Sequence, residues 1–322
     1  MEPVEIQSDG RPPLVVILGP TAVGKTELSL ELAGRLGGEI VSADSRLFYR
    51  GLDIGTAKPT RDERARAPHH LIDVAAPDEI WSLAVFQAQA RQAIAEIYAR
   101  GRLPLLVGGT GQYIRAVTQG WTPPEVQPDP RLRQTLESWA AQIGPDGLHQ
   151  RLAVLDPAAA ERIDARNLRR TVRALEVILS SGRRFSEQRA AVPAVYRVLQ
   201  VGLNRPRPEL YARIDARVDA MLAAGLVDEV RGLLAQGYSP DLPGLSAIGY
   251  REVIAFLQGK ISLEEAVLQI KRDTRTFVRR QANWFKPDDP DIHWFLAGAG
   301  AAETILGVIE NWQADAKTGK NI

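Results

Sequence analysis

Short apolar runs alternate with amphipathic segments along the first third of the chain. One run covers residues 14–18, and after a glycine-rich loop an amphipathic segment extends to about residue 36. Similar runs lie at 39–42 and 103–107, with helix-like sequence at 82–99. Short apolar runs predict buried strands, and a period of 3.6 residues predicts helices. Their alternation predicts an α/β fold with a parallel sheet whose faces are both covered.

The pattern changes at residues 121–130, WTPPEVQPDP, where four prolines in ten residues are typical of a linker. Residues 131–189 then look wholly helical and rich in arginine. A strand-like run, YRVLQVGL, returns at 196–203, and helical sequence follows to about Lys286. The simplest interpretation is an α/β core that is interrupted by a helical insertion.

We therefore expect a core of residues 12–125 and 195–322, including C-terminal helices, and a mostly helical insertion of residues 126–194. The chain has 322 residues, ordinary globular composition and a net charge of +1, so a nucleic-acid surface would require local clustering of basic residues. It has no cysteine, which excludes disulfides, thiol nucleophiles and cysteine-ligated zinc. Without a membrane-length apolar stretch or a signal-like N-terminus, we expect a cytoplasmic monomer with no membrane and no obligate protein partner.

The loop after the first strand carries the strongest chemical signal. Its sequence, GPTAVGKT, fits G-x-x-x-x-G-K-[ST] without a mismatch. In such loops glycines allow backbone amides to point at phosphate oxygens, Lys25 supplies a charge and the Thr26 hydroxyl can bind Mg²⁺. The flanking strand and helix disfavour a chance match and predict a P-loop NTPase-like core. The predicted phosphate-binding residues are Gly19, Pro20, Thr21, Ala22, Val23, Gly24, Lys25 and Thr26.

The positions of acidic residues restrict the reactions that the phosphate loop could support. The strand at 103–107 runs into GGTG and not into the acidic residue that ATP hydrolysis usually requires. The acidic residue that does follow a strand is Asp44, in ADSRLFY (43–49). A carboxylate there faces the crevice where α/β sheets bind ligands. Asp44 is either a general base, an anchor for the acceptor, or a helix cap or loop salt bridge.

Nine segments, in order and with matching spacing, resemble the motif series of the tRNA dimethylallyltransferases. They are GPTAVGKT (19–26), ADSRLFY (43–49), DIGTAKP (53–59), PHHLID (68–73), VGGTGQY (107–113), NLRRTVRALEV (167–177), RIDARVDAM (213–221), SAIGYRE (246–252) and RRQANWFK (279–286). The resemblance covers nearly the whole chain. Leu47 departs from it, because many members carry Gln there, and the zinc-finger extension of some eukaryotic members is absent.

The resemblance implies a reaction. Dimethylallyl diphosphate donates its prenyl group to N6 of the adenosine just 3′ of the anticodon, position 37, in tRNAs that read codons beginning with U, and diphosphate leaves. Asp44 would take the proton of the weakly nucleophilic amine. Lys25, Mg²⁺ bound at Thr26 and Arg217 would stabilise the leaving diphosphate, and the Thr21 hydroxyl would reach its bridging oxygen.

In two helical segments the basic residues lie on one face and the apolar residues on another. This separation favours contact with a nucleic-acid phosphate backbone over an ordinary solvated surface. In the first, four arginines lie opposite an apolar face: Arg166, Arg169, Arg170 and Arg173 against Leu168, Val172, Leu175, Ile178 and Leu179. In the second, apolar residues recur every seven positions while basic ones share another face: Leu263, Ile270, Phe277 and Trp284 against Arg272, Arg275, Arg279 and Lys286.

We expect the insertion to grip the tRNA anticodon stem-loop while the adenine is flipped into a channel between the phosphate loop and Asp44. The predicted tRNA contacts are Asp44, Ser45, Arg46, Leu47, Thr110, Arg133, Arg169, Arg170, Arg173, Ser246, Gly249, Tyr250, Arg251, Arg279, Arg280, Gln281 and Trp284. The adjacent His69 and His70 cannot share a helix face as metal ligands, so we interpret PHHLID as structural.

Three other functions fit parts of the sequence. A P-loop small-molecule kinase would use the phosphate loop but leave both arginine faces without a role. A free-nucleotide (AMP or ATP) isopentenyltransferase would not require the arginine-rich insertion. A non-catalytic RNA-binding protein would not require an intact Lys25, Thr26 and Asp44.

Overall fold

The chain forms two compact units in this computed structural model, which describes residues 10–120, 124, 126–127, 129–188 and 194–318. One unit, the core unit, joins Met1–Thr118 to Ala194–Ile322, and the other, the insertion, is Gln119–Pro193. The insertion thus begins a few residues before the expected boundary at 126. Much of the expected linker (121–123, 125 and 128), and Arg189, where the helical run was expected to end, lie outside the described residues.

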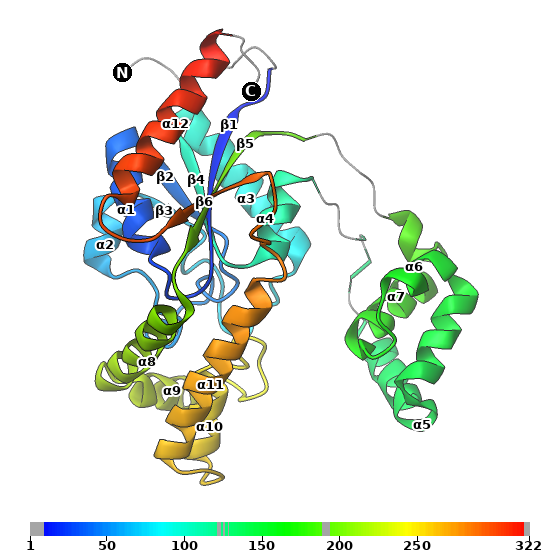
Figure 1. Cartoon of the computed structure of the whole chain (residues 1–322). Coiled ribbons are helices and arrows are strands. Elements are labelled where there is room, and N and C mark those ends of the chain that lie inside the picture. The colour runs from blue at the N-terminus through cyan, green and yellow to red at the C-terminus, as the bar shows by residue number, and fades with distance from the viewer. Residues whose placement is uncertain (1–9, 121–123, 125, 128, 189–193, 319–322) are drawn as a thin grey trace. The chain divides into compact units, whose positions relative to one another are not determined.

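A six-stranded parallel sheet forms the centre of the core unit (Figure 1). Its order is β3-β2-β4-β1-β5-β6. The strands are β1 (Pro13–Leu18), β2 (Glu39–Ser42), β3 (His69–His70), β4 (Pro104–Gly108), β5 (Arg197–Asn204) and β6 (Ile292–Leu296). After β1 the chain builds one side of the sheet, and it crosses to the other side only at β5. The carboxyl end of β1 therefore lies at the switch point where such sheets bind ligands.

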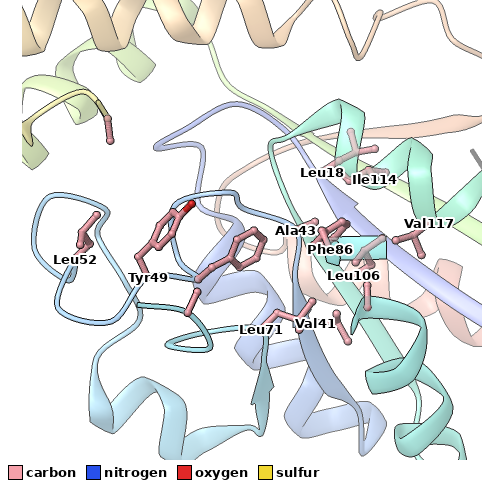
Figure 2. Close-up of a cluster of buried hydrophobic side chains, with 14 of the residues drawn as sticks. Leu18, Val41, Ala43, Tyr49, Leu52, Leu71, Phe86, Leu106, Ile114 and Val117 are labelled. Atoms are coloured by element: carbon pink, nitrogen blue, oxygen red, sulfur yellow. The ribbon is translucent and has the colours of Figure 1, made fainter. Parts of the chain in front are cut away.

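Residues of β1 alternate between two cores, as the period of a strand requires. Leu14, Val16 and Leu18 enter one hydrophobic cluster, whereas Val15 and Ile17 enter the other. Figure 2 shows part of the first cluster, in which Leu18, Val41 and Leu106 from three strands face Phe86 and neighbouring side chains. Both faces of β1 are thus buried, which fixes the start of the phosphate loop.

Helices cover both faces of this sheet and its carboxyl end. One cluster includes residues of α1 (Lys25–Leu36) and α12 (Ala301–Thr318), and the other includes residues of α3 (Leu83–Ala99) and α4 (Gly111–Thr118). Beyond the carboxyl ends of the strands lie four further helices (Figure 1). They are α8 (Arg207–Ala223), α9 (Leu226–Ala235), α10 (Tyr250–Leu257) and α11 (Leu263–Gln281). A short helix, α2 (Arg61–Arg66), precedes β3.

The insertion has a hydrophobic core of its own. It comprises α5 (Pro130–Leu155), α6 (Pro157–Arg162), α7 (Leu168–Ser181) and a short 3₁₀ helix, η1 (Phe185–Gln188). Gly144, with φ +78°, breaks the helical backbone within α5 just before Pro145. Side chains of α5, α6 and α7 pack together, including Leu136, Leu148, Leu152, Val172 and Leu175.

Several local predictions fail for identifiable reasons. The strands β3 and β6 and the helix α12 were not predicted, because β3 has only two residues and β6 follows an acidic, proline-containing turn. The seven-residue apolar spacing around α11 is not its packing face. Leu263 and Phe277 are 39% and 41% exposed, and Trp284 lies beyond the helix end. The buried residues of α11 are Ala266, Ile270, Val278 and Gln281.

Candidate active site

The carboxyl ends of four parallel strands bring the predicted catalytic elements to one edge of the sheet. The loop 19–26 follows β1, Asp44 follows β2 by two residues, the GGTG turn follows β4, and Arg205 follows β5. Because neighbouring parallel strands end on the same side, segments far apart in the sequence share one crevice. This is the arrangement that the sequence predicted for Asp44 and the loop.

The phosphate loop requires glycine at two positions. Gly19 has φ +147°, and a Cβ built there would lie 2.6 Å from the carbonyl oxygen of Leu203 on β5. Gly24 has φ +115° at the start of α1, a conformation that side chains disfavour. Ala22 also adopts a positive φ, +66°. Non-glycine residues seldom do so, and such strain is held only where the surroundings impose it.

Three cationic side chains hold the carbonyl side of this loop. The Lys25 ammonium donates to the carbonyl oxygens of Gly19 (3.0 Å) and Pro20 (2.9 Å). From the region of α8, the Nε of Arg213 donates to the Ala22 carbonyl and the Nε of Arg205 to the Val23 carbonyl, both at 2.9 Å. These bonds explain how the strained Ala22 is kept in place.

The amide side of the loop is left open. Within the described residues, the structure gives no hydrogen-bond partner to the backbone N–H groups of Ala22, Gly24, Lys25 and Thr26. The Thr21 N–H, in contrast, donates to Oε1 of Gln281 at 3.0 Å. Free amides at the start of α1, together with the helix dipole, form a binding site for an anion such as phosphate.

Lys25, Asp44 and Arg217 interact electrostatically across the site. Burial lowers the pKa of Lys25 to about 8, an effect that Asp44 opposes and Arg217 reinforces. Burial likewise lowers the pKa of Arg217, and Asp44 again opposes it. The structure thus brings together the three predicted catalytic charges, and the two cations that crowd each other here would gain from a bound anion.

Asp44 and the residues after it form one rim of the crevice. The side chains of Asp44, Ser45, Arg46 and Leu47 are all half-buried. One Asp44 carboxylate oxygen accepts the Arg46 N–H at 3.0 Å, and among the described residues no hydrogen bond is recorded for the other. The Arg46 guanidinium and the Ser246 hydroxyl both donate to the carbonyl of Pro243, at 2.6 Å each. Residues 44–47 and 243–246 are therefore fastened together.

The turn after β4 packs tightly against its neighbours. A Cβ on Gly108 would lie 2.4 Å from the Ala43 carbonyl oxygen, and one on Gly111 would lie 2.5 Å from the Trp284 side chain. Thr110, half-buried, precedes α4. Tyr113 stacks on Phe86 with 4.3 Å between ring centroids, and burial raises its pKa to about 12. This part of the wall is aromatic and uncharged.

Three predicted tRNA contacts are buried, so their positions do not support direct contact. Tyr250 is fully buried, and its hydroxyl donates to Glu229 at 2.6 Å. Gly249 is buried, and its amide donates to Glu252 at 2.7 Å. Gln281 is only 5% exposed and contacts the phosphate loop and the β4 turn. The sequence could not reveal these roles, because the partners lie on other elements.

Most arginines of the two predicted basic faces are paired. Arg173 donates to Glu176 at 2.8 Å, and the other pairs are Arg166 with Asp164, Arg272 with Asp273 and Arg275 with Asp215. Arg133, a predicted tRNA contact outside these faces, also donates to Glu176 at 2.8 Å. Arg166 precedes α7, which Asn167 caps, so it does not belong to the predicted helical face. Leu179, expected to pack, is 53% exposed. Arg251, another predicted contact, pairs with Asp273 and Glu252.

Four of the arginines predicted to contact tRNA are exposed and have no ion-pair partner among the described residues. Arg169 and Arg170 on α7, and Arg279 and Arg280 at the end of α11, are exposed, and the described part of the chain offers them no ion pair within 4.0 Å. The prediction of tRNA contacts is therefore best supported at these positions.

The segments DIGTAKP and PHHLID have structural roles at this rim. The buried Lys58 ammonium lies between Asp53 and Asp73, 2.5 Å from each, and Arg64 pairs with Asp73 at 2.8 Å. Glu229 accepts the amides of Asp53, Ile54 and Gly55. Away from this rim, at the amino end of β2, His70 pairs with Glu39 at 2.7 Å. The two motifs form one ion-paired scaffold, in agreement with the structural interpretation of PHHLID.

Two loop contacts, Arg205 and Arg213, were not predicted. Arg213 lies one helical turn before Arg217, and that spacing on α8 could have indicated it. Arg205 had no such signal. Over the residues that the structure describes, no three or more His, Asp or Glu side chains are grouped to hold a metal ion. Nor is any helix in that part long and apolar enough to cross a membrane.

A parallel sheet with a phosphate loop after β1, a carboxylate after β2 at the same edge and a helical insertion defines a P-loop protein built to bind a phosphorylated ligand beside a second substrate. The chain belongs to the IPP transferase family, whose model matches residues 47–288. It is 57% identical to the tRNA dimethylallyltransferase of Roseiflexus sp. (strain RS-1), over 85% of this chain and 90% of that protein.

Solved structures are similar over nearly the whole chain. The full-length tRNA isopentenylpyrophosphate transferase of Bacillus halodurans is 40% identical, with a TM-score of 0.72 over 96% of this chain and 99% of that chain. A eukaryotic dimethylallyltransferase, studied acting on tRNA, is 27% identical, with a TM-score of 0.80 over 97% and 81%. These likenesses confirm the predicted fold class and the predicted family.

Proposed function

We propose that this chain is a tRNA dimethylallyltransferase, which transfers the dimethylallyl group of dimethylallyl diphosphate to N6 of adenosine 37 in tRNAs that read codons beginning with U. The observation that carries the proposal is the pairing of a phosphate loop, with free amides and Lys25, and the Asp44 carboxylate at one edge of the sheet. Family membership and the tRNA-modifying relatives support the choice of acceptor.

The diphosphate end of the donor is assigned to the loop. The free N–H groups of Ala22, Gly24, Lys25 and Thr26 would donate hydrogen bonds to its oxygens, and the Lys25 and Arg217 charges would balance the charge that grows as the C–O bond breaks. Lys25 and Arg217 disfavour each other's charge in the free protein, and the departing diphosphate would offset that repulsion.

Asp44 is assigned to the acceptor. The lone pair of an adenine amine is delocalised, so a base must remove its proton as the new C–N bond forms. One carboxylate oxygen of Asp44 is oriented by the Arg46 amide, which leaves the other available for that proton. Asp44 also interacts electrostatically with Lys25 and Arg217, which would hold the donor's diphosphate.

The site fits Mg²⁺ at one position. Thr26 is exposed at the first turn of α1, and within the described chain no hydrogen bond occupies its hydroxyl. A single hydroxyl oxygen beside diphosphate oxygens and water is the ligand set that Mg²⁺ prefers. Bound there, the ion would withdraw negative charge from the diphosphate.

The cytoplasmic location and the monomeric state of the protein stay predictions.

Transfer of radiolabelled dimethylallyl from its diphosphate to unmodified tRNA tests the proposal, with AMP and ATP offered as competing acceptors. We expect Mg²⁺-dependent label in tRNA that is lost with Asp44→Ala, while the affinity for tRNA changes little. Label in AMP would instead identify a free-nucleotide enzyme, and phosphate transfer from ATP without prenylation would identify a kinase. Equal losses of catalysis and tRNA affinity in Asp44→Ala would exclude the role of base.

A further inference from the structure

Gln281, the last residue of α11, is almost fully buried between two loops of the active site. Its Oε1 accepts the N–H of Thr21 in the phosphate loop at 3.0 Å, and its Nε2 donates to the carbonyl of Gly109 in the β4 turn at 3.0 Å. Both hydrogen-bonding ends of the amide are thus used. The two contacts link residues that are 260 and 172 positions away in the sequence.

The β4 turn is shaped to admit this side chain. A Cβ built on Gly109 would lie 2.4 Å from Nε2 of Gln281 and 3.1 Å from the Gly19 carbonyl oxygen. Any other residue at 109 would therefore displace Gln281 from the loop. After the helix end, Trp284 packs on Gly111, and Arg115 donates to the Trp284 carbonyl at 3.1 Å. These contacts hold the end of α11 on both sides of Gln281.

The bond to Thr21 determines how the loop is used. The Thr21 amide is the one loop N–H in the run 21–26 that a side chain occupies, among those the structure describes. The free amides begin at Ala22, so the diphosphate is directed to the α1 side of the loop. Fixing the Thr21 amide also fixes the backbone that carries its hydroxyl, which we assign to the bridging oxygen of the donor.

We propose that Gln281 is a positioning residue for the reaction: its side-chain amide orients Thr21 toward the donor, and it does not contact tRNA. The inference rests on the proposed transfer reaction and deepens it. It replaces the tRNA contact that the sequence suggested for Gln281 with a role in the phosphate loop. A displacement of about 1 Å at a reacting group costs on the order of 100-fold in rate, so a role of this kind is measurable.

A double-variant cycle with Thr21 tests the proposal. Gln281→Met keeps the size of the side chain but removes both hydrogen bonds, and Thr21→Val removes only the hydroxyl. If Gln281 acts through Thr21, we expect Gln281→Met to lower kcat by about 10- to 100-fold. The double variant should then be no slower than Thr21→Val, because coupled residues give non-additive effects. The Kd for tRNA should be unchanged.

Gln87 provides a matched control for the loss of a buried glutamine. It is 6% exposed on α3, and its Nε2 donates to the Ala116 carbonyl on α4 and not to the phosphate loop. Gln87→Met should lower the Tm without lowering kcat, and it should combine additively with Thr21→Val. Independent, multiplying effects of Gln281→Met and Thr21→Val would overturn the proposal, as would a weakened tRNA Kd with unchanged kcat.

Inorganic diphosphate gives a readout that does not depend on catalysis. If Gln281→Met unfolds, Gln281→Glu keeps the acceptor for Thr21 and should weaken diphosphate binding through charge repulsion, while tRNA affinity stays the same. Unchanged diphosphate binding by Gln281→Glu would contradict the placement beside the loop. If the wild-type protein does not prenylate tRNA, the proposed function fails, yet diphosphate binding still shows whether Gln281 supports the loop.

Discussion

The core unit and the insertion each gather cationic side chains around hydrogen-bond acceptors, but the acceptors differ in charge. In the core unit, Lys25 and Arg213 bind neutral backbone carbonyls of the phosphate loop. In the insertion, Arg133 and Arg173 bind the carboxylate of Glu176, which is fully buried. A carbonyl orients a cation without neutralising it, whereas a carboxylate cancels its charge.

The difference separates cations that can bind an anionic substrate from those that stabilise the protein. The loop cluster keeps its positive charge, and the low pKa of Lys25 shows that the charge is held at a cost. Burial by itself raises the pKa of Glu176, but hydrogen bonds from Arg173 and Arg133 outweigh it and hold the pKa below its ordinary value. The number of arginines in the sequence does not show which cations are neutralised, whereas the structure shows the acceptor that each of these cations binds.

Removing the loop charge should have the largest effect. Lys25→Met should lower kcat/KM for the donor by about 100- to 1,000-fold, because a preorganised charge on the leaving group is lost. Initial rates at saturating tRNA measure this. Arg100→Met is the control, since Arg100 pairs with Glu39 at the opposite end of β2. Comparable losses in both variants would mean that net charge, and not the loop cation, matters.

Removing the buried carboxylate should affect stability and not the donor. Glu176→Ala leaves Arg133, Arg173 and the Asp129 amide without their acceptor, which should destabilise the insertion by about 2–4 kcal/mol. Hydrogen exchange at the amides of α5 and α7, measured over a series of urea concentrations, reports on the insertion. Glu187→Ala, which breaks an exposed 3.7 Å pair with Arg184, should change little. An insertion of unchanged stability would show that Glu176 is not the centre of this cluster.

The two clusters should also respond to pH in opposite ranges. Donor kcat/KM should fall as pH rises through about 8, because free Lys25 loses its proton there. Diphosphate binding above that pH should take up a proton, which calorimetry in buffers of different ionisation enthalpy detects. The folded pKa of Glu176 is lowered, so its contribution to stability is present above the ordinary glutamate pKa of 4.5 and is lost only in more acidic solution. Donor kinetics that stay flat from pH 7 to 9.5 would contradict the assignment to Lys25.

The smallest effect is expected at the exposed end of α7. Arg169 and Arg170 lie in the first turn of that helix, where the dipole disfavours cations, so helix stability does not explain them. Arg169→Gln with Arg170→Gln should weaken tRNA binding about 10-fold and lower the slope of log K against log salt by about 1.5. Filter binding at several salt concentrations measures both. The insertion should be no less stable, and an unchanged salt slope would remove these residues from the interface.

The sequence was sufficient for the phosphate-binding motif and for most of the elements around it. The phosphate loop, the position of Asp44 and the main strands follow from motifs and periodicity, and the structure agrees. It was insufficient where the burial of a residue or the choice of its partner depends on the tertiary fold. Tyr250 was predicted to contact tRNA, because its burial and its hydrogen bond to Glu229 could not be foreseen. Arg173 was predicted to be free, although Glu176 lies only three residues later, because an exposed and a buried glutamate look the same in a sequence.

The pairing of β1 with β5 has a consequence for how the protein is made. β1 lies between β4 and β5, but β5 begins only at Arg197, after the whole insertion. A ribosome must therefore synthesise the insertion before the strand that carries the phosphate loop gains its second neighbour. Because the insertion builds its core from its own residues, it is able to fold while β1 is still an open edge. The order of synthesis thus places the assembly of the catalytic crevice last.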